Sequence, residues 1–408
     1  MDRRAVVGGM TASLISAMAP WAATAKLGDR RLKAYLRTNW SQDPFSFGSY
    51  SYIAKGASRR DHRALETPID DKVFFAGEAV HPNYNSTVHA AYESGQRAAA
   101  AVIETGARRI AVIGAGMSGL SAAHALSKLG RDVVVYDARA RIGGRIWTDD
   151  RLGPPVDLGA SWIHGVDGNP LTALADALGQ ERVATEEAYV IRGGDGRRIA
   201  DREAPEWLDD VIEVQHTAGA DVSQLNMFAY LFSDGYDGVD VKFPNGYGQI
   251  FDALRGDYAV ALERQVTRVT IGENGVALGI GDDASDHDAV IVTVPLGVLK
   301  QGAIAFEPPL PDRKRRAIER LGMGLLDKVY LLFEEPFWDA DATWIVTPEN
   351  DLPPGQFNQW LNLHKYVGAP LLLAFNGGPP AFDLAAMPDN VLVERGLQTL
   401  AMAYPPQR

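Results

Sequence analysis

The sequence predicts an α/β fold in which a dinucleotide-binding domain is joined to a second domain built on a mixed sheet flanked by helices. The first observation is one βαβ unit: an apolar strand, a glycine-rich turn, a helix and a second strand, expected over 109–113, 114–119, 118–129 and 133–136. The second is a further set of strongly apolar strands, expected over 289–294, 328–333 and 371–375. With 408 residues the chain is long enough for two or three domains.

The composition excludes several classes of function. A hydrophobic content of 46% and a charged content of 23% are those of an ordinary globular protein. The net charge of -12 argues against nucleic-acid binding, which needs clustered Lys and Arg, and is compatible with a cationic substrate. The chain has no cysteine, so disulfides, cysteine-ligated metals, a thiol nucleophile and a thioether-linked cofactor are excluded. We expect no metal site.

Residues 1–25 have the features of an export signal. Arg3 and Arg4 precede a run of apolar and small residues from Ala5 to Ala23, and an A-x-A-like cleavage site follows. The paired arginines favour a twin-arginine type of signal. The alternative is a first helix of the folded domain, in which case the protein is cytoplasmic. We expect an exported protein, periplasmic or secreted, without stable membrane insertion once the signal is removed.

The segment between the signal and the βαβ unit also has recognisable elements. A strand is expected over 34–40 and a turn-rich loop over 43–50, followed by a short buried strand over 73–76. A helix is expected over 86–104, where Gly95 and the alanines around it provide a smooth face for close packing.

The glycine-rich turn has the spacing of a dinucleotide-binding site. Gly114 turns the chain, Gly116 lets backbone amides approach a pyrophosphate, and Gly119 lets the helix pack closely on the strand. A carboxylate should end the second strand to accept hydrogen bonds from ribose hydroxyls, and Asp137 stands there.

The residues that follow identify the dinucleotide by resemblance. The segments 137–145 and 156–165, which include "DARARIGGR" and "GASWIHG", resemble the flavin-dependent amine oxidases, the second being closest to polyamine oxidases of the spermine oxidase and plant peroxisomal type. The resemblance implies a Rossmann-like FAD-binding domain of the glutathione-reductase/amine-oxidase type and non-covalent FAD. The family usually has Glu where this chain has Asp137. The cofactor-binding residues implied in this half of the site are Gly114, Gly116, Gly119, Asp137, Arg139, Gly144, Arg145, Gly159, Ala160, Ser161, Trp162 and Val266.

A second FAD signature stands in an unexpected place. Gly77-Glu78 and Thr87-Val88-His89 resemble a segment that lies near the C-terminus in the family, yet here it precedes the glycine-rich turn. The resemblance implies that Glu78 binds ribityl or ribose hydroxyls. It also implies that the amides of Thr87 and Val88 face the flavin, where a helix N-terminus stabilises negative charge.

This order predicts a circularly permuted chain. By the same resemblance Trp40 and Gly77 also bind the cofactor, so the residues of one FAD site come from two segments in an unusual order along the chain. The predicted seam is the short link 105–108, a routine connection between a helix and a strand. The predicted cut lies between residues 405–408 and the segment near Arg31.

Three residues are candidates for catalysis. Tyr50 should form an aromatic wall beside the flavin and attract a cationic amine, but the facing position is Thr87, so the cage is expected to be one-sided. By resemblance His164 binds an amine nitrogen in the substrate channel. Lys328 begins an apolar strand and needs a partner, since burying an unpaired ammonium is costly. In the family the equivalent lysine holds a water near flavin N5.

The resemblance implies oxidative deamination of a primary or secondary amine, with a polyamine favoured. Hydride passes from the amine to flavin N5, giving an imine and then an aldehyde, and dioxygen reoxidises the flavin to yield hydrogen peroxide. The alternatives are an L-amino-acid oxidase, which needs an arginine for the substrate carboxylate, a carotenoid-type desaturase, and a flavoprotein made inactive by rearrangement.

The domains should alternate along the chain. The expected parts are a signal over 1–25, a substrate-domain strand and flavin-edge loop over 26–70, FAD-binding segments over 71–170 and 246–300, and substrate-domain segments over 171–245 and 301–408. Of the substrate-domain segments, 171–245 should be helical.

Overall fold

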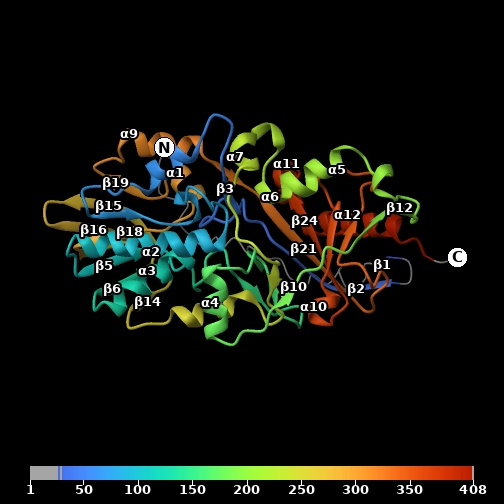
Figure 1. The fold of residues 1–408 in the computed structure, drawn as a ribbon, viewed down its shortest axis with the longest axis horizontal. Coiled ribbons are helices and arrows are strands. Elements are labelled where there is room, and N and C mark those ends of the chain that lie inside the picture. The colour runs from blue at the N-terminus through green and yellow to red at the C-terminus, as the bar shows by residue number, and fades with distance from the viewer. Residues whose placement is uncertain (1–25, 28–29, 407–408) are drawn as a thin grey trace, which may run out of the picture.

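A five-stranded parallel sheet forms the core of the first domain, on the left in Figure 1. The computed structural model describes residues 26–27 and 30–406, so the predicted export signal lies outside the described residues. The strands of this sheet, in spatial order, are β14 (Ala259–Ala261), β6 (Asp132–Tyr136), β5 (Arg109–Ile113), β18 (Ala289–Val292) and β4 (Val73–Phe75). The predicted dinucleotide-binding βαβ unit is therefore confirmed.

The two faces of this sheet are covered by different layers. In β5, Ile110 and Val112 pack under the helices α2 (Val88–Glu104) and α3 (Met117–Lys128). Their neighbours Ala111 and Ile113 point to the opposite face, as the two-residue period of a strand requires. That face is covered by a four-stranded sheet of β17 (Asp283–His287), β16 (Gly275–Ile280), β15 (Val266–Gly272) and β19 (Ala305–Glu307).

An eight-stranded mixed sheet forms the second domain, on the right in Figure 1. Its strands, in spatial order, are β1 (Lys26–Leu27), β2 (Arg30–Arg37), β21 (Leu326–Phe333), β24 (Leu371–Gly377), β23 (Gln359–Asn362), β22 (Trp344–Val346), β11 (Tyr189–Arg192) and β12 (Arg198–Ile199). Neighbours are antiparallel except β11 and β22. Apolar residues of α11 (Gly378–Ala385) and α12 (Asp389–Ala403) pack on one face. The predicted mixed sheet with flanking helices is thus confirmed.

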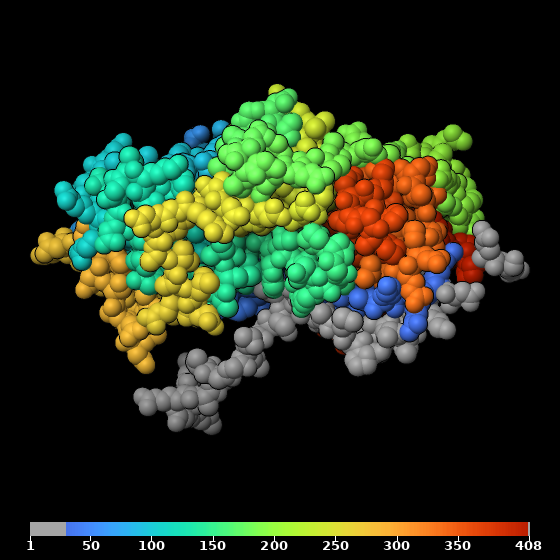
Figure 2. Space-filling model, turned by 90° about the horizontal axis from the view of Figure 1, so that it is seen from below, coloured from blue at the N-terminus to red at the C-terminus, as the bar shows by residue number. Residues whose placement is uncertain are grey.

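Shorter elements connect the two sheets. The remaining strands are β3 (Tyr50–Tyr52), paired with β20 (Gly322–Gly324); β7 (Thr148–Asp149), paired with β8 (Val156–Asp157); and β10 (Val183–Ala184), β13 (Val241–Lys242) and β9 (Trp162–Ile163), which form one small sheet. The remaining α-helices are α1 (Arg59–Glu66), α4 (Pro170–Ala177), α5 (Trp207–Asp209), α6 (His216–Ala218), α7 (Met227–Leu231), α8 (Leu296–Lys300), α9 (Asp312–Arg320) and α10 (His364–Val367). Figure 2 shows the surface passing from cyan and yellow segments to orange and red ones, with green segments at the junction.

Two expected elements differ from the structure for identifiable reasons. The strand expected over 34–40 ends at Arg37, because the Asp327 carboxylate accepts hydrogen bonds from Thr38 Oγ1 (2.8 Å) and Trp40 N (3.0 Å) and draws the chain out of the sheet. The segment 171–245, expected to be helical, also contains the short strands β10 to β13.

The segment that stands before the βαβ unit belongs to both domains. Its strand β2 lies in the eight-stranded sheet, whereas β4 and α2 lie in the first domain. Helix α2 ends at Glu104 and β5 begins at Arg109, so the predicted link over 105–108 is a short connection. Helix α1 packs on the first domain through Ala64 and Leu65. The predicted domain boundaries stay a prediction.

Helices α2 and α3 pack at the closest approach that a glycine allows. A Cβ on Gly95 would clash with Ser121 Oγ and with the carbonyl oxygen of Ser118. We expect Gly95→Ala to lower the free energy of unfolding by about 1–3 kcal/mol, because the two helices must separate. Denaturant unfolding measures this change. The control is Gly235→Ala, since no atom lies within 4 Å of a Cβ at Gly235. Equal stability of both variants would contradict the close packing.

Candidate active site

One cavity of about 1630 Å³ runs from the glycine-rich turn to the eight-stranded sheet. It brings together residues from both halves of the predicted site. The predicted residues that line it are Trp40, Tyr50, Gly77, Glu78, Thr87, Val88, Gly114, Gly116, Asp137, Arg139, Gly144, Arg145, Gly159, Ala160, Ser161, Trp162, His164, Val266 and Lys328. Gly119 is the exception and has a packing role.

The glycine-rich turn follows β5 and begins α3. Gly114 has a φ of +112°, which a residue with a side chain rarely adopts. A Cβ on Gly119 would clash with the carbonyl oxygen of Gly114, so this glycine lets the helix lie on the strand. At Gly116 the nearest atom to a Cβ is 4.0 Å away, so the backbone there is open to the cavity.

Asp137 holds the turn from the end of β6. Its Oδ2 accepts a hydrogen bond from Ala115 N (2.7 Å), and its Oδ1 accepts one from Arg139 N (2.8 Å). The Arg139 guanidinium forms a bidentate ion pair with Asp43 (2.7 and 2.9 Å) and donates to Ser46 Oγ (3.0 Å). Arg139 therefore lines the cavity, but its charge is paired with Asp43 in the loop that precedes β3.

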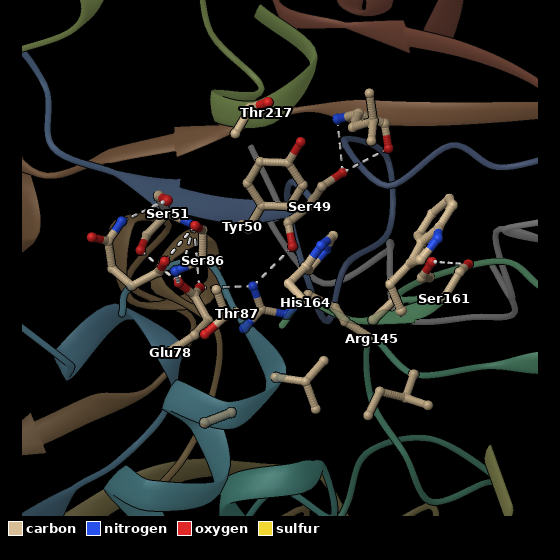
Figure 3. A pocket seen from close by; sticks show the side chains of 18 of the residues that line it. Ser49, Tyr50, Ser51, Glu78, Ser86, Thr87, Arg145, Ser161, His164 and Thr217 are labelled. Carbon is tan, nitrogen blue, oxygen red and sulfur yellow. Dashed lines mark hydrogen bonds and ion pairs between the residues drawn. The ribbon is translucent and has the colours of Figure 1, made fainter. Parts of the chain in front are cut away.

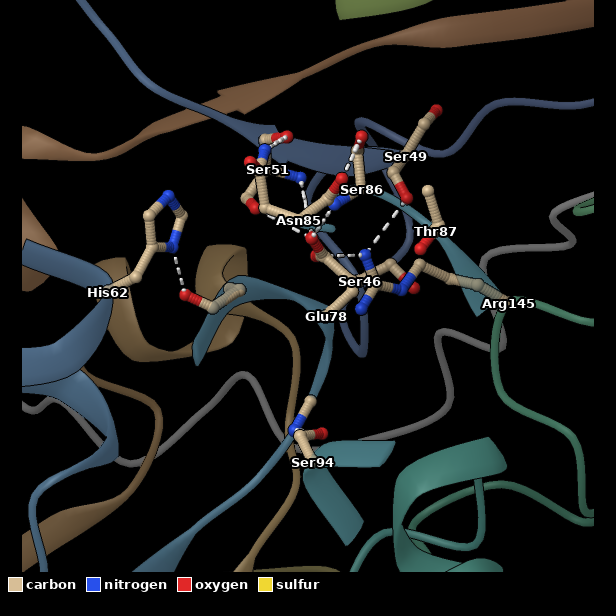
Figure 4. Close-up of polar contacts among 12 residues, drawn as sticks. Ser46, Ser49, Ser51, His62, Glu78, Asn85, Ser86, Thr87, Ser94 and Arg145 are labelled. Carbon is tan, nitrogen blue, oxygen red and sulfur yellow. Dashed lines mark hydrogen bonds and ion pairs between the residues drawn. The ribbon is translucent and has the colours of Figure 1, made fainter. Parts of the chain in front are cut away.

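Glu78, which is buried, and Arg145, which is partly buried, form an ion pair in the cavity wall (Figure 4). Arg145 Nη1 donates to Glu78 Oε1 (2.8 Å) and to the carbonyl oxygen of Ser49 (2.9 Å). Glu78 Oε2 also accepts hydrogen bonds from Ser51 Oγ (2.6 Å) and Ser86 N (2.9 Å). Burial alone would raise the pKa of Glu78, but the charge of Arg145 and these hydrogen bonds hold it below its ordinary value.

Helix α2 begins at the cavity with a side-chain cap. Thr87 Oγ1 accepts a hydrogen bond from Ala90 N (3.1 Å) and donates to the carbonyl oxygen of Tyr84 (2.7 Å). The 17-residue helix thus directs its positive dipole end into the cavity. Its first residue, Val88, lines the cavity, and so does Gly77. No atom lies within 4 Å of the position that a Cβ on Gly77 would occupy.

These features fit a flavin dinucleotide. Open backbone at Gly116 and Gly77 leaves room for a ligand against the chain, and the N-termini of two helices suit phosphate and a negatively charged ring. The Asp137 carboxylate at the end of β6 is placed to accept ribose hydroxyls. The cavity has space for this group together with a substrate.

Lys328 lies on β21 with its ammonium nitrogen fully buried. Its Nζ donates to the carbonyl oxygens of Asp157 (2.8 Å) and Gly159 (2.6 Å) and to Ser161 Oγ (2.6 Å). The expected need for a partner is met by this loop and not by the neighbouring Asp327. Burial, with the nearby charge of Lys242, lowers the pKa of Lys328 well below its ordinary value.

A second buried lysine, which the sequence reasoning missed, lies behind the same loop. Lys242 Nζ lies 3.8 Å from the ring centroid of Trp162, so Trp162 separates it from the cavity. Burial lowers the pKa of Lys242 to about 8, although the Asp157 carboxylate opposes the shift. No sequence signal distinguished this lysine from a solvated one at a strand end.

Tyr50 and His164 both line the cavity, and Figure 3 draws their side chains there. The Tyr50 hydroxyl donates to the carbonyl oxygen of His216 (2.5 Å), which fixes its ring as a wall. His164 Nδ1 lies 2.6 Å from Asp240 Oδ2, while Asp240 Oδ1 accepts from Gly165 N (2.9 Å). Asp240 was not predicted, and it orients the imidazole so that Nε2 is the free nitrogen.

The cavity also has aromatic walls beyond Tyr50. Trp344 on β22 and Phe375 on β24 line it together with Trp162, with centroids 6.3 Å and 6.1 Å from the Trp162 ring. These rings give the cavity an aromatic surface on the eight-stranded sheet in addition to Tyr50, and the one-sided cage expected from Thr87 stays a prediction. Sequence reasoning missed it because these strands lie far from Tyr50 in the chain.

Two features are absent from the described residues. In residues 26–27 and 30–406, no group of three or more His, Asp or Glu side chains is placed to hold a metal ion. The same part of the chain has no helix of the length and hydropathy needed to cross a membrane.

Comparison with known proteins identifies the family of this chain. The profile of the family "Flavin containing amine oxidoreductase" matches residues 18–103, 117–213 and 184–408. The chain is 31% identical over 355 residues to Protein FLOWERING LOCUS D of Arabidopsis thaliana, covering 73% of this chain but only 45% of that protein. It is 30% identical over 364 residues to Polyamine oxidase 2 of Arabidopsis thaliana, covering 74% of each.

Solved structures agree on the fold. A single mutant of putrescine oxidase matches with a TM-score of 0.57 and 21% identity, covering 73% of this chain and 82% of that one. Cyclohexylamine oxidase from Brevibacterium oxydans IH-35A matches with a TM-score of 0.56 and 22% identity, covering 74% and 82%. With the family profile and the relatives at 30% identity or more, these findings show that the chain belongs to the family of flavin-containing amine oxidoreductases.

Proposed function

We propose that the protein is an amine oxidase that uses non-covalently bound FAD and dioxygen to oxidise a primary or secondary amine, with a polyamine favoured. The products are an imine, which is hydrolysed to an aldehyde, and hydrogen peroxide. The observation that carries the proposal is the single cavity, which joins the dinucleotide cradle at Gly114 and Gly116 to the aromatic wall at Tyr50. Cofactor and substrate can therefore come into contact within one cavity.

The chain supplies the groups that would hold the cofactor. Gly116, Asp137 and the start of α2 at Thr87 and Val88 line the part of the cavity assigned to it. When bound, the flavin supplies the acceptor for the two electrons removed from the amine. The absence of cysteine from the sequence supports a non-covalent attachment.

His164 is the proposed acceptor for a substrate nitrogen. Its Nδ1 faces Asp240, so its Nε2 is free to accept a hydrogen bond from the amine. The Tyr50 ring in the same cavity would attract an ammonium and pack against alkyl carbon. Together the two side chains would orient the carbon next to the nitrogen.

Lys328 is the proposed proton-handling group. Burial lowers the pKa of Lys328, so its nitrogen can change between the ammonium form, which donates to all three partners, and the free amine, which can accept a proton. The Ser161 hydroxyl, 2.6 Å from Nζ, links the lysine to the loop that lines the cavity. We propose that Lys328 positions the water that hydrolyses the imine.

Charge in the cavity argues against the L-amino-acid oxidase alternative. Among the described residues that line the cavity, each arginine already has a carboxylate partner: Arg139 with Asp43, Arg145 with Glu78, and Arg264 with Asp283. None is free to pair with a substrate carboxylate. Seven carboxylates line the side of the cavity between residues 186 and 240, which favours a cationic substrate.

Two observations support a circular permutation. The family profile matches residues 18–103 separately from the later segments. The two ends of the described chain also lie together, since Arg30 Nη1 donates to the carbonyl oxygen of Tyr404 (2.6 Å). We propose a permuted arrangement of the family fold. A reordered gene that places residues 26–107 after residue 406 should yield a flavin-binding protein, and an insoluble product without flavin would count against the proposal.

Export stays a proposal that rests on the paired arginines near the start of the sequence. Cell fractionation tests it, and a protein found only in the cytoplasm with residues 1–25 intact would refute it.

The purified protein should be yellow and should release hydrogen peroxide from a polyamine. A coupled peroxide assay over polyamines, monoamines, amino acids and methyl-lysine peptides measures this activity and ranks the substrate classes. Peroxide from L-amino acids alone would select the alternative oxidase. A colourless protein that releases no peroxide would select the inactive flavoprotein.

Lys328→Met should slow turnover by about 100-fold, because the variant loses its proton-handling nitrogen. Stopped-flow spectroscopy separates flavin reduction from reoxidation, and Lys300→Met serves as a control outside the cavity. A Lys328→Met enzyme that reduces and reoxidises its flavin at wild-type rates would show that the assigned role is wrong.

A further inference from the structure

Helix α7 and the residue after it present an apolar patch to solvent. Phe228, Leu231 and Phe232 are between 63% and 74% exposed, more than any other large apolar side chain among the residues that the structure describes. Their spacing of three and four positions places them on one side of the helix. The rings of Phe228 and Phe232 pack on each other, with centroids 4.7 Å apart. Contiguous exposed apolar surface often marks an interaction site.

Helix α7 is held firmly in place, so the exposure of the apolar patch is a feature of the fold. Asn226 Oδ1 accepts a hydrogen bond from Ala229 N (3.2 Å) and caps the helix, while Asn226 Nδ2 donates to the carbonyl oxygen of Ala57 (2.9 Å). The Tyr230 hydroxyl donates to the carbonyl oxygen of Glu213 (2.6 Å). None of the three residues of the apolar patch lines the cavity, so the patch is separate from the proposed reaction site.

Two helices rich in arginine adjoin the apolar patch. Helix α1 lies next to it, since Arg59 Nη2 donates to the carbonyl oxygen of Phe232 and Arg59 Nη1 lies 3.7 Å from Asp234 Oδ2. Helix α9 packs against α1, with Lys314 Nζ donating to the carbonyl oxygen of Thr67 (2.7 Å) just beyond the end of α1. Figure 1 shows α9, α1 and α7 in succession along the upper edge of the molecule.

Helices α1 and α9 carry positive charge although the chain is acidic. Together they contain eight Lys and Arg and four Asp and Glu, whereas the whole chain has 40 and 52. Four exposed arginines of these helices form neither an ion pair nor a side-chain hydrogen bond with the described residues, and we call them the basic patch: Arg60, Arg63, Arg313 and Arg316. Their charge is therefore available to a partner.

The basic patch and the apolar patch together match the surface of an anionic lipid bilayer. Guanidinium groups attract the phosphates of lipid headgroups, and Phe and Leu side chains enter the boundary between headgroups and acyl chains. A nucleic acid would pair with the arginines but offers no hydrocarbon to Leu231. The combination of charge and apolar surface thus favours lipid.

We propose that α1, α7 and α9 form a docking surface for an anionic lipid bilayer, in which the basic patch binds headgroup phosphates and the apolar patch enters the interface. This inference does not depend on the proposed amine oxidase function. The contact is peripheral, because five residues of helix are far too short to cross a bilayer. The net charge of -12 repels an anionic surface from the rest of the molecule, so the basic patch also sets the orientation of docking.

Sedimentation of the holoprotein with vesicles tests the proposal. We expect binding to vesicles of phosphatidylcholine mixed equally with phosphatidylglycerol, and weaker binding as salt screens the charges. Arg60→Gln with Arg63→Gln should weaken binding about 30-fold, since each basic residue near an anionic surface contributes a factor of about five. Phe228→Ser with Leu231→Ser should weaken it about tenfold, because the apolar contact is lost.

Two double variants serve as matched controls. Lys33→Gln with Arg202→Gln makes the same change in charge at exposed residues of the second domain. Leu129→Ser with Val260→Ser removes exposed apolar side chains from the first domain. Both controls should bind the mixed vesicles as wild type does. All four double variants should keep the flavin content and melting temperature of wild type, since none of the altered residues lines the cavity.

Four results would overturn the docking surface. The first two are a wild-type protein that does not bind the mixed vesicles and one that binds vesicles of phosphatidylcholine alone equally well. The third is a loss of binding in a control equal to the loss in its matched variant. The fourth is another occupant: a dimer in sedimentation velocity that Phe228→Ser with Leu231→Ser dissociates, or retention of duplex DNA, in either case without vesicle binding.

Discussion

The buried amine of Lys328 imposes the constraint on which the arrangement of the two domains depends. Its side chain extends from β21, the third strand in the eight-stranded sheet, and its nitrogen must find partners because an unsatisfied buried amine is costly. The carbonyl oxygens of Asp157 and Gly159 provide them. Tyr330, on the same strand, adds a hydrogen bond to the carbonyl oxygen of Asp157 (2.7 Å). The loop that lines the cavity is thereby fastened to the second domain, and the cavity lies beside this junction.

The Glu78–Arg145 ion pair connects the segment that precedes the βαβ unit with the segment that follows it. Glu78 follows β4, and Arg145 follows the glycine-rich turn and β6, while Ser51 comes from β3. Three separate parts of the chain therefore meet at one carboxylate. These contacts require only that the three parts lie close together in space, whatever their order along the chain. A permuted order is therefore compatible with one complete site.

Two lysines and two arginines of the site differ in how far their local sequence predicts their partners. Lys328 was recognisable because it begins an apolar strand, whereas Lys242 follows a polar segment and carries no such signal. Arg145 and Arg139 both follow the glycine-rich turn, yet Arg139 pairs with Asp43, a residue nearly a hundred positions earlier. Asp43 lies in a turn-rich loop, and nothing in its local pattern indicates a partner so far away in the chain.

The sequence by itself determined the βαβ unit, the glycine-rich turn and a minority of the residues that line the cavity. Those features depend on local periodicity and on backbone conformations that only glycine adopts easily. Tertiary structure alone decided which side chains meet: Asp240 with His164, and Trp344 and Phe375 with Trp162. These contacts join residues distant in the chain. Long-range packing leaves no local pattern in the sequence from which it could be predicted.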